Sequence, residues 1–169
     1  MDIQFTSKKV GEILGKGNLR IPSYQRPYKW DRKHIRNLFY DLQDAMGKRE
    51  YQVGSVILHE NDGHLDIVDG QQRLISISLL LHLLDYVNNY EGATQLLSTE
   101  FGELSCYHAS ENYNEWQNLT RLVGEKQTKN ICEFLLENCS ISCIIMPEKR
   151  LAEAFQLFDS QNNRGKSLE

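Results

Sequence analysis

Apolar side chains are densest between residues 65 and 84, and their spacing changes within this stretch. Leu65, Ile67 and Val68 form a short apolar run that is typical of a strand. A polar turn follows at residues 69–73, and eight leucine and isoleucine side chains then fall on nearly every face of a helix over residues 74–84. A helix that is apolar all round is normally enclosed by its neighbours. The pattern therefore predicts a strand, a turn and a buried helix around which the domain packs.

The chain before this stretch predicts two helices and a hairpin. Residues 10–14 have apolar side chains at helical spacing and are followed by glycines, which favours a short helix. Residues 31–47 begin with an aspartate suited to capping and end at a glycine, with apolar positions every three or four residues between them. The run at 51–58 indicates a strand, and the Asn-Asp-Gly turn at 61–63 predicts an antiparallel hairpin with the strand at 65–68.

The chain after the buried helix gives weaker signals. Between residues 88 and 140 the apolar spacing indicates two covering helices, around 116–123 and 131–135, and no catalytic chemistry. Residues 141–145 predict a strand, and 151–158 predict the inner stripe of a further helix. Together these elements predict a mixed α+β fold.

The amino-acid composition limits which classes of protein the chain can belong to. A chain of 169 residues that is 40% hydrophobic can form one domain with its own core. The net charge of −4 disfavours a protein that coats DNA by bulk positive charge, although a local basic face stays open. The sequence has no apolar leader and no run of 18 apolar residues, so we expect a cytoplasmic location and no membrane contact. The four cysteines lack the spacing of zinc sites, so we expect reduced thiols and no metal bound by them.

The turn at residues 69–73 holds the densest polar chemistry. We expect Asp69 to cap the helix, Gly70 to permit a tight turn, and Gln71, Gln72 and Arg73 to occupy the first helical turn. Unpaired backbone N–H groups and the helix dipole favour an anion there. One interpretation is a cap with surface amides. The other is a phosphate site, in which arginine supplies charge, glutamine orients water or a ribose, and aspartate holds a metal or water.

A second polar segment, residues 20–30, contains two prolines that favour a stiff, extended ribbon. Tyr24, Gln25 and Arg26 combine an aromatic face, an amide and a guanidinium, which suits stacking on a base and gripping a phosphate. The alternative is a strand whose aromatic side chains fill the core and whose Arg26 pairs with a carboxylate.

Three basic residues, Arg32, Lys33 and Arg36, lie near the start of the helix predicted after Asp31. The helix dipole disfavours cations at this end. They are therefore either placed for an external anion such as DNA or part of a solvated charged face.

The tail, residues 159–169, also admits two interpretations. Gly165-Lys166-Ser167 imitates the end of a P-loop, but the earlier glycine of that motif would fall at Ser160, and the segment follows a helix instead of opening one. A Walker A site is therefore excluded. The tail is either a helix end with a turn at Gly165 or an amide-rich loop that faces the same ligand as Arg73.

Four separated motifs resemble, in the same order, the N-terminal domain of GmrSD-type modification-dependent restriction proteins: IPSYQRPYKW at 21–30, VGSVIL at 53–58, VDGQQRL at 68–74 and FDSQNNRGKSL at 158–168. The resemblance spans almost the whole chain. It implies a ParB/sulfiredoxin-like mixed sheet around a long buried helix, with additional covering helices. It also implies one domain over residues 1–169, separate from a C-terminal HNH-type nuclease region, whose His-Asn-His centre nothing here resembles.

The resemblance further implies binding and hydrolysis of a nucleoside triphosphate with Mg²⁺, in defence against phage. Carried over, it assigns catalysis to Asp69, Gln71, Gln72 and Arg73. It assigns nucleotide binding, or the sensing of modified DNA, to Tyr24, Gln25 and Arg26, and further nucleotide binding to Gly70, Asn162, Asn163 and Arg164. The alternative is a nonenzymatic ParB-like switch that binds nucleotide or DNA. Both require that Arg26, Arg73 and Asn162 converge at the start of the buried helix.

Overall fold

One mixed sheet organises the domain. The computed structural model describes residues 2–100 and 102–164, and side chains of residues 2–100 and 102–160. Within these residues, five strands lie in the order β1-β5-β3-β4-β2. They are β1 (Gln4–Lys9), β2 (Leu19–Arg20), β3 (Tyr51–Asn61), β4 (His64–Asp69) and β5 (Cys139–Met146). Strand β3 pairs antiparallel with β4 and parallel with β5, so the predicted hairpin is confirmed.

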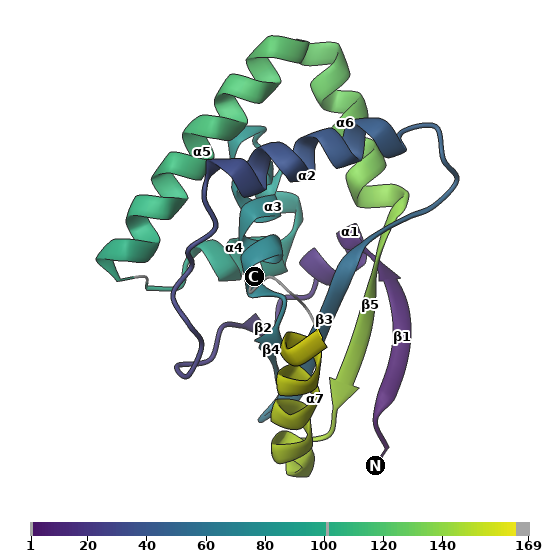
Figure 1. The fold of residues 1–169 in the computed structure, drawn as a ribbon, viewed down its shortest axis with the longest axis vertical. Helices are drawn as coiled ribbons and strands as arrows, with labels where there is room; N and C mark the ends of the chain where they lie inside the picture. Colours follow the sequence, from purple (N-terminus) through teal and green to yellow (C-terminus); the bar gives the residue numbers. More distant parts are fainter. Residues whose placement is uncertain (1, 101, 165–169) are drawn as a thin grey trace.

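Helices cover both faces of this sheet (Figure 1). Alternating side chains of β5 separate the faces: Ile141 and Cys143 belong to the main core, and Ile144 and Met146 to a smaller cluster. The main core is shared with the first six helices and the smaller cluster with the seventh, so the predicted α+β class is confirmed. The helices are α1 (Val10–Leu14), α2 (Arg32–Ala45), α3 (Gln71–Leu83), α4 (Glu91–Leu97), α5 (Glu103–Val123), α6 (Glu125–Glu137) and α7 (Leu151–Arg164), with 3-10 turns η1 (Val87–Asn89) and η2 (Glu148–Arg150).

Helix α3 is the predicted buried helix. Every residue from Leu74 to Leu81 is buried, and so are the two glutamines that open the helix. Leucine and isoleucine on all faces allow α3 to pack at once against α4, α5 and η1. The polar start of this helix is therefore enclosed by protein as well.

The predicted cap of α3 is wrong. Asp69 is the last residue of β4, paired opposite Ile57, and the N-cap is Gly70, which makes no side-chain cap. Gly70 has φ of 102°, and a Cβ there would lie 2.6 Å from Cγ1 of Val56. Strand pairing holds Asp69 extended, so the sharp turn falls on the glycine that follows. In contrast, the predicted cap of α2 is confirmed, because the Asp31 carboxylate accepts two backbone N–H groups.

Other boundaries also differ from the sequence prediction. Helix α2 ends at Ala45 instead of Gly47, and neither β1 nor α4 was predicted. Helix α7 continues through Arg164, so the loop interpretation is wrong for residues 159–164. The turn expected at Gly165 lies outside the described residues, as do the side chains of residues 162–164.

Candidate functional site

The ribbon at residues 20–30 passes the N-terminal end of α3 and is held there by Gln72. Oε1 of Gln72 accepts the backbone N–H groups of Lys29 at 2.9 Å and Trp30 at 3.1 Å. Nε2 of Gln72 donates to the carbonyl oxygen of Pro27 at 3.2 Å. The side chain is buried, so these bonds fix the ribbon against the helix. The predicted catalytic role of Gln72 would require some of them to break.

Two other glutamines fasten the same ribbon. Nε2 of Gln71 donates to the carbonyl oxygen of Arg26 at 2.6 Å. Nε2 of Gln25 donates to the carbonyl oxygens of Ile67 and Val68, both at 2.6 Å. The ribbon thus covers the edge of β4 beyond the short strand β2. The backbone of Arg26 is consequently fixed beside the first turn of α3.

Arg73, the fifth residue of the DGQQR motif, lies between the ribbon and β3. Its Cζ is 5.4 Å from the centre of the Trp30 ring. On β3, a Cβ at Gly54 would overlap Nη1 of Arg73, and Gly54 has φ of 152°. Glycine at this position therefore makes room for the guanidinium.

Helix α7 meets the ribbon through two aromatic contacts. The rings of Tyr24 and Phe155 lie edge to face with centroids 5.1 Å apart. Cζ of Arg26 lies 5.3 Å from the centre of the Phe158 ring. The FDSQNNRGKSL motif therefore begins beside Arg26. The backbone of Arg26 is bonded to the first turn of α3, but the guanidinium groups of Arg26 and Arg73 lie on different aromatic rings. The side chain of Asn162 lies outside the described part of the chain, so the convergence of the three residues stays a prediction.

A cavity of about 400 Å³ opens beside these residues. Gln25, Arg26 and Gln71 line one side of it, and residues 99–100 and 102–105 line the other. We call it the motif cavity. Tyr24 is not among its lining residues and instead packs on α7.

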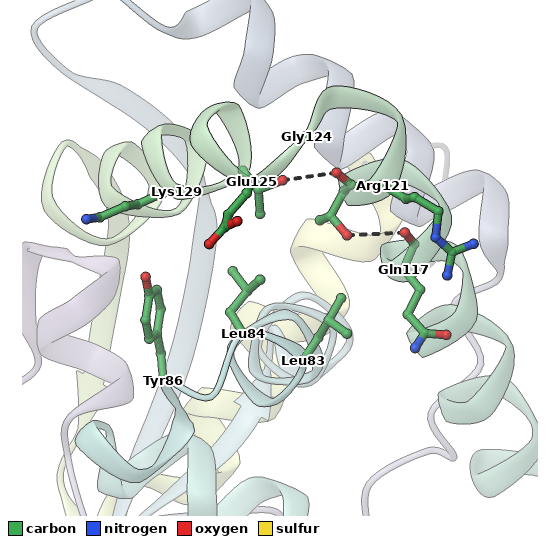
Figure 2. A pocket seen from close by; sticks show the side chains of 10 residues that line it. Leu83, Leu84, Tyr86, Gln117, Arg121, Gly124, Glu125 and Lys129 are labelled. Atoms are coloured by element: carbon green, nitrogen blue, oxygen red, sulfur yellow. Dashed lines mark hydrogen bonds between the residues drawn. The ribbon is translucent and has the colours of Figure 1, made fainter.

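A larger cavity, of about 550 Å³, lies at the opposite end of α3. We call it the distal cavity; it is lined by Leu83, Leu84, Tyr86, Gln117, Thr120, Arg121, Gly124, Glu125, Thr128 and Lys129. Figure 2 shows Tyr86 on the left, Gln117 on the right, and the two leucines between them, below Glu125. None of its lining residues belongs to the four motifs.

A comparison with models of known protein families identifies the family of this chain. The model of the GmrSD restriction endonuclease N-terminal domain matches residues 10–169. The chain belongs to this family. A comparison with curated proteins finds no match. Membership makes the chain a domain of the restriction, or phage-defence, class. Among the described residues, no helix is both long and apolar enough to cross a membrane.

A buried polar network supports the ribbon of this GmrSD-type domain from behind. The Tyr28 hydroxyl donates to Ser76 at 2.6 Å, because the Ser76 hydroxyl itself donates to the carbonyl of Gln72. Nδ2 of Asn112 donates to the Tyr28 oxygen at 2.8 Å and to the carbonyl of Trp30 at 2.6 Å. Burial raises the pKa of Tyr28 to about 12, so its hydroxyl keeps its proton. Sequence reasoning missed this network; the signal for it was a serine inside a leucine-rich helix.

The basic residues of α2 in the GmrSD-type domain face carboxylates of α5. Nη1 of Arg32 and Nη1 of Arg36 lie 3.1 and 3.3 Å from the two oxygens of Glu115. Nε of Arg32 also lies 3.2 Å from Glu111. Both guanidinium groups therefore join α2 to α5, which gives them a structural role that neither interpretation of the sequence included. Of the three basic residues, Lys33 and Arg36 are exposed and Arg32 is half-buried.

Proposed function

We propose that this domain binds a nucleoside triphosphate at the N-terminal end of α3 and hydrolyses it with Mg²⁺. The observation that carries the proposal is the meeting of all four motifs there. Gln71 and Gln72 hold the ribbon, Arg73 lies against Gly54 of the VGSVIL motif, and Arg26 lies on Phe158 of the last motif. A structural cap alone would need none of these long-range contacts.

The triphosphate would bind at the first turn of α3. Backbone N–H groups and the positive end of the helix dipole favour an anion at this position. Arg73 projects from that turn, and Gln71 fixes the backbone of Arg26 next to it. In this proposal both guanidinium groups would reach the same polyphosphate and donate charge-assisted hydrogen bonds to it.

The base and ribose would enter the motif cavity. Its volume of about 400 Å³ lies within the range of small-molecule sites. Gln25 donates to two backbone carbonyls and Gln71 to one, and both residues line the cavity. Asn162, Asn163 and Arg164 would close the site from α7, as the resemblance implies.

The fit of Mg²⁺ depends on one carboxylate. Among the described residues, no group of three or more histidine, cysteine or acidic side chains is placed to hold a metal ion. Mg²⁺ that arrives with a triphosphate needs only one or two protein carboxylates, because phosphates and water complete its coordination. Asp69 is half-buried at the end of β4, directly before Gly70, and would supply that ligand.

Phosphate release in the presence of Mg²⁺ tests this proposal. The four common triphosphates would be compared for the wild type, Asp69→Ala and Arg73→Ala, with Arg121→Ala in the distal cavity as the matched control. We expect release by the wild type and the control, and loss in the two motif variants at unchanged thermal unfolding. Equal activity of Arg73→Ala and wild type would overturn the proposal.

A second candidate is a nonenzymatic switch that binds nucleotide, or DNA in the context of a restriction protein. The commitment of Gln71 and Gln72 to the ribbon favours it, because these amides are then less available to orient water. Thermal stabilisation by nucleotide without phosphate release would identify this switch. In that case DNA binding to the isolated domain, if it occurs, should weaken as salt increases.

A further inference from the structure

Both arginines of the proposed phosphate site lie against aromatic rings, and the ring beside Arg73 is itself tightly held. The indole of Trp30 stacks on His34, with ring centroids 5.0 Å apart and planes 13° apart. Its backbone N–H donates to Gln72, and its carbonyl accepts from Asn112. Trp30 is only 4% exposed. The indole is therefore a fixed surface instead of a mobile side chain.

One atom of this indole is poorly placed for stability. Nε1 of Trp30 is buried, and no described residue accepts a hydrogen bond from it. A buried donor without an acceptor destabilises a fold. The second tryptophan differs, because Nε1 of Trp116 donates to the carbonyl of Ser76 at 2.9 Å. The unpaired Nε1 is therefore a cost that the indole has at position 30 and not at position 116.

A contact with Arg73 also distinguishes the indole at position 30. Cζ of Arg73 lies 5.4 Å from the centre of the Trp30 ring, within the range of cation–π attraction. Indole binds cations better than the other aromatic side chains do. On the β3 side, Gly54 has no side chain to displace the guanidinium. Trp30 and Gly54 together form a slot that restricts the orientation of a long, flexible side chain.

We propose that Trp30 is the positioning residue for Arg73, and that its indole orients the guanidinium toward the phosphates of the ligand. This inference rests on the proposed function, because it concerns the same site. Trp30 acts through Arg73 and does not itself contact the reacting atoms. Removing the indole should therefore weaken phosphate binding more than it weakens the fold.

The test compares Trp30→Phe and Trp30→Leu with Trp116→Phe, a matched loss of indole volume at a buried site outside the ligand contacts. Affinity for a nonhydrolysable ATP analogue with Mg²⁺ would be measured by calorimetry. We expect Trp30→Phe to bind about two- to fivefold more weakly than wild type and Trp30→Leu more weakly still. Trp116→Phe should lower the unfolding temperature and leave the affinity unchanged.

Tryptophan fluorescence reports whether the ligand reaches the guanidinium beside the Trp30 ring. Phosphate binding pairs the charge of that guanidinium, so the analogue should change the emission of the wild type. The change should persist in Trp116→Phe and disappear in Trp30→Phe.

These experiments distinguish a failure of the proposed function from a failure of the positioning role of Trp30. Absence of binding by the wild type would overturn the proposed function and this inference together. Binding by the wild type with equal affinity in Trp30→Phe, or an equal loss in Trp116→Phe, would overturn the positioning role alone. If Trp30→Leu fails to fold, Trp30→Phe and the fluorescence change still decide.

Discussion

The two ends of α3 offer opposite kinds of cavity. At the C-terminal end, the distal cavity is the larger, at about 550 Å³ against about 400 Å³ for the motif cavity. Two of its polar side chains bond to carbonyl groups nearby in the chain: Thr120 donates to Trp116 within α5, and Thr128 at the start of α6 donates to Thr120. At the N-terminal end, side-chain bonds join segments that lie more than 40 residues apart. Hydrogen bonds between distant segments, rather than cavity volume, therefore distinguish the candidate site from the distal cavity.

The largest expected difference between the ends is in stability. Gln72→Ala would leave the N–H groups of Lys29 and Trp30 and the carbonyl of Pro27 without their partner in a buried setting. We expect a loss of about 3 kcal/mol in the free energy of unfolding. Gln117→Ala, the matched change in the distal cavity, should cost less than about 0.5 kcal/mol. Denaturant titration measures both, and equal losses would remove the contrast.

A smaller effect concerns pH at the start of the ribbon. Burial raises the pKa of Asp66, but hydrogen bonds from Arg20 at 2.6 Å and Asn61 at 2.9 Å outweigh it, so the net pKa is lowered. A lowered folded-state pKa contributes stability above the unfolded value of about 3.9, and that stability is lost as the pH falls through the folded-state pKa.

The corresponding variant is Asp66→Asn, which cannot titrate. We expect it to be less stable than wild type at neutral pH and to lose less stability on acidification. Thermal unfolding measured between neutral and strongly acidic pH would show this as converging curves. Parallel curves would mean that the pairing of Asp66 with Arg20 does not couple the ribbon to the sheet.

The smallest effect is expected at the distal cavity. Arg121 and Lys129 are both exposed at its rim. Changing both to alanine should leave nucleotide affinity within about twofold of wild type, because a substitution away from the binding contacts alters the free energy by less than about 0.5 kcal/mol. A tenfold loss in calorimetry would show that the distal cavity also takes part in nucleotide binding.

The sequence predicted the elements that depend on local pattern. The apolar run after residue 73 identified α3, and the Asn-Asp-Gly turn identified the β3–β4 hairpin. Helix α4 was missed because seven residues are too few for a clear period. The cap of α3 was misassigned because capping preference favours Asp69, whereas strand pairing with β3 decides its conformation.

For the candidate site, the sequence predicted which residues take part but not the contacts that they make. Sequence reasoning found the polar residues of each motif and, through the family resemblance, predicted that they converge. It did not find that Gln71 and Gln72 bond the ribbon, that Gly54 makes room for Arg73, or that Trp30 lies against it. These contacts join segments far apart in the chain, and no periodicity within one segment reports them.

Hydrogen–deuterium exchange of the domain, with and without a nonhydrolysable ATP analogue and Mg²⁺, would locate the nucleotide site. We expect slower exchange of backbone amides at residues 21–30 and 70–74, around the start of α3. We expect unchanged exchange at residues 83–86 and 117–129, around the distal cavity. Slower exchange at the distal cavity alone, or no change anywhere, would contradict a nucleotide site at the N-terminal end of α3.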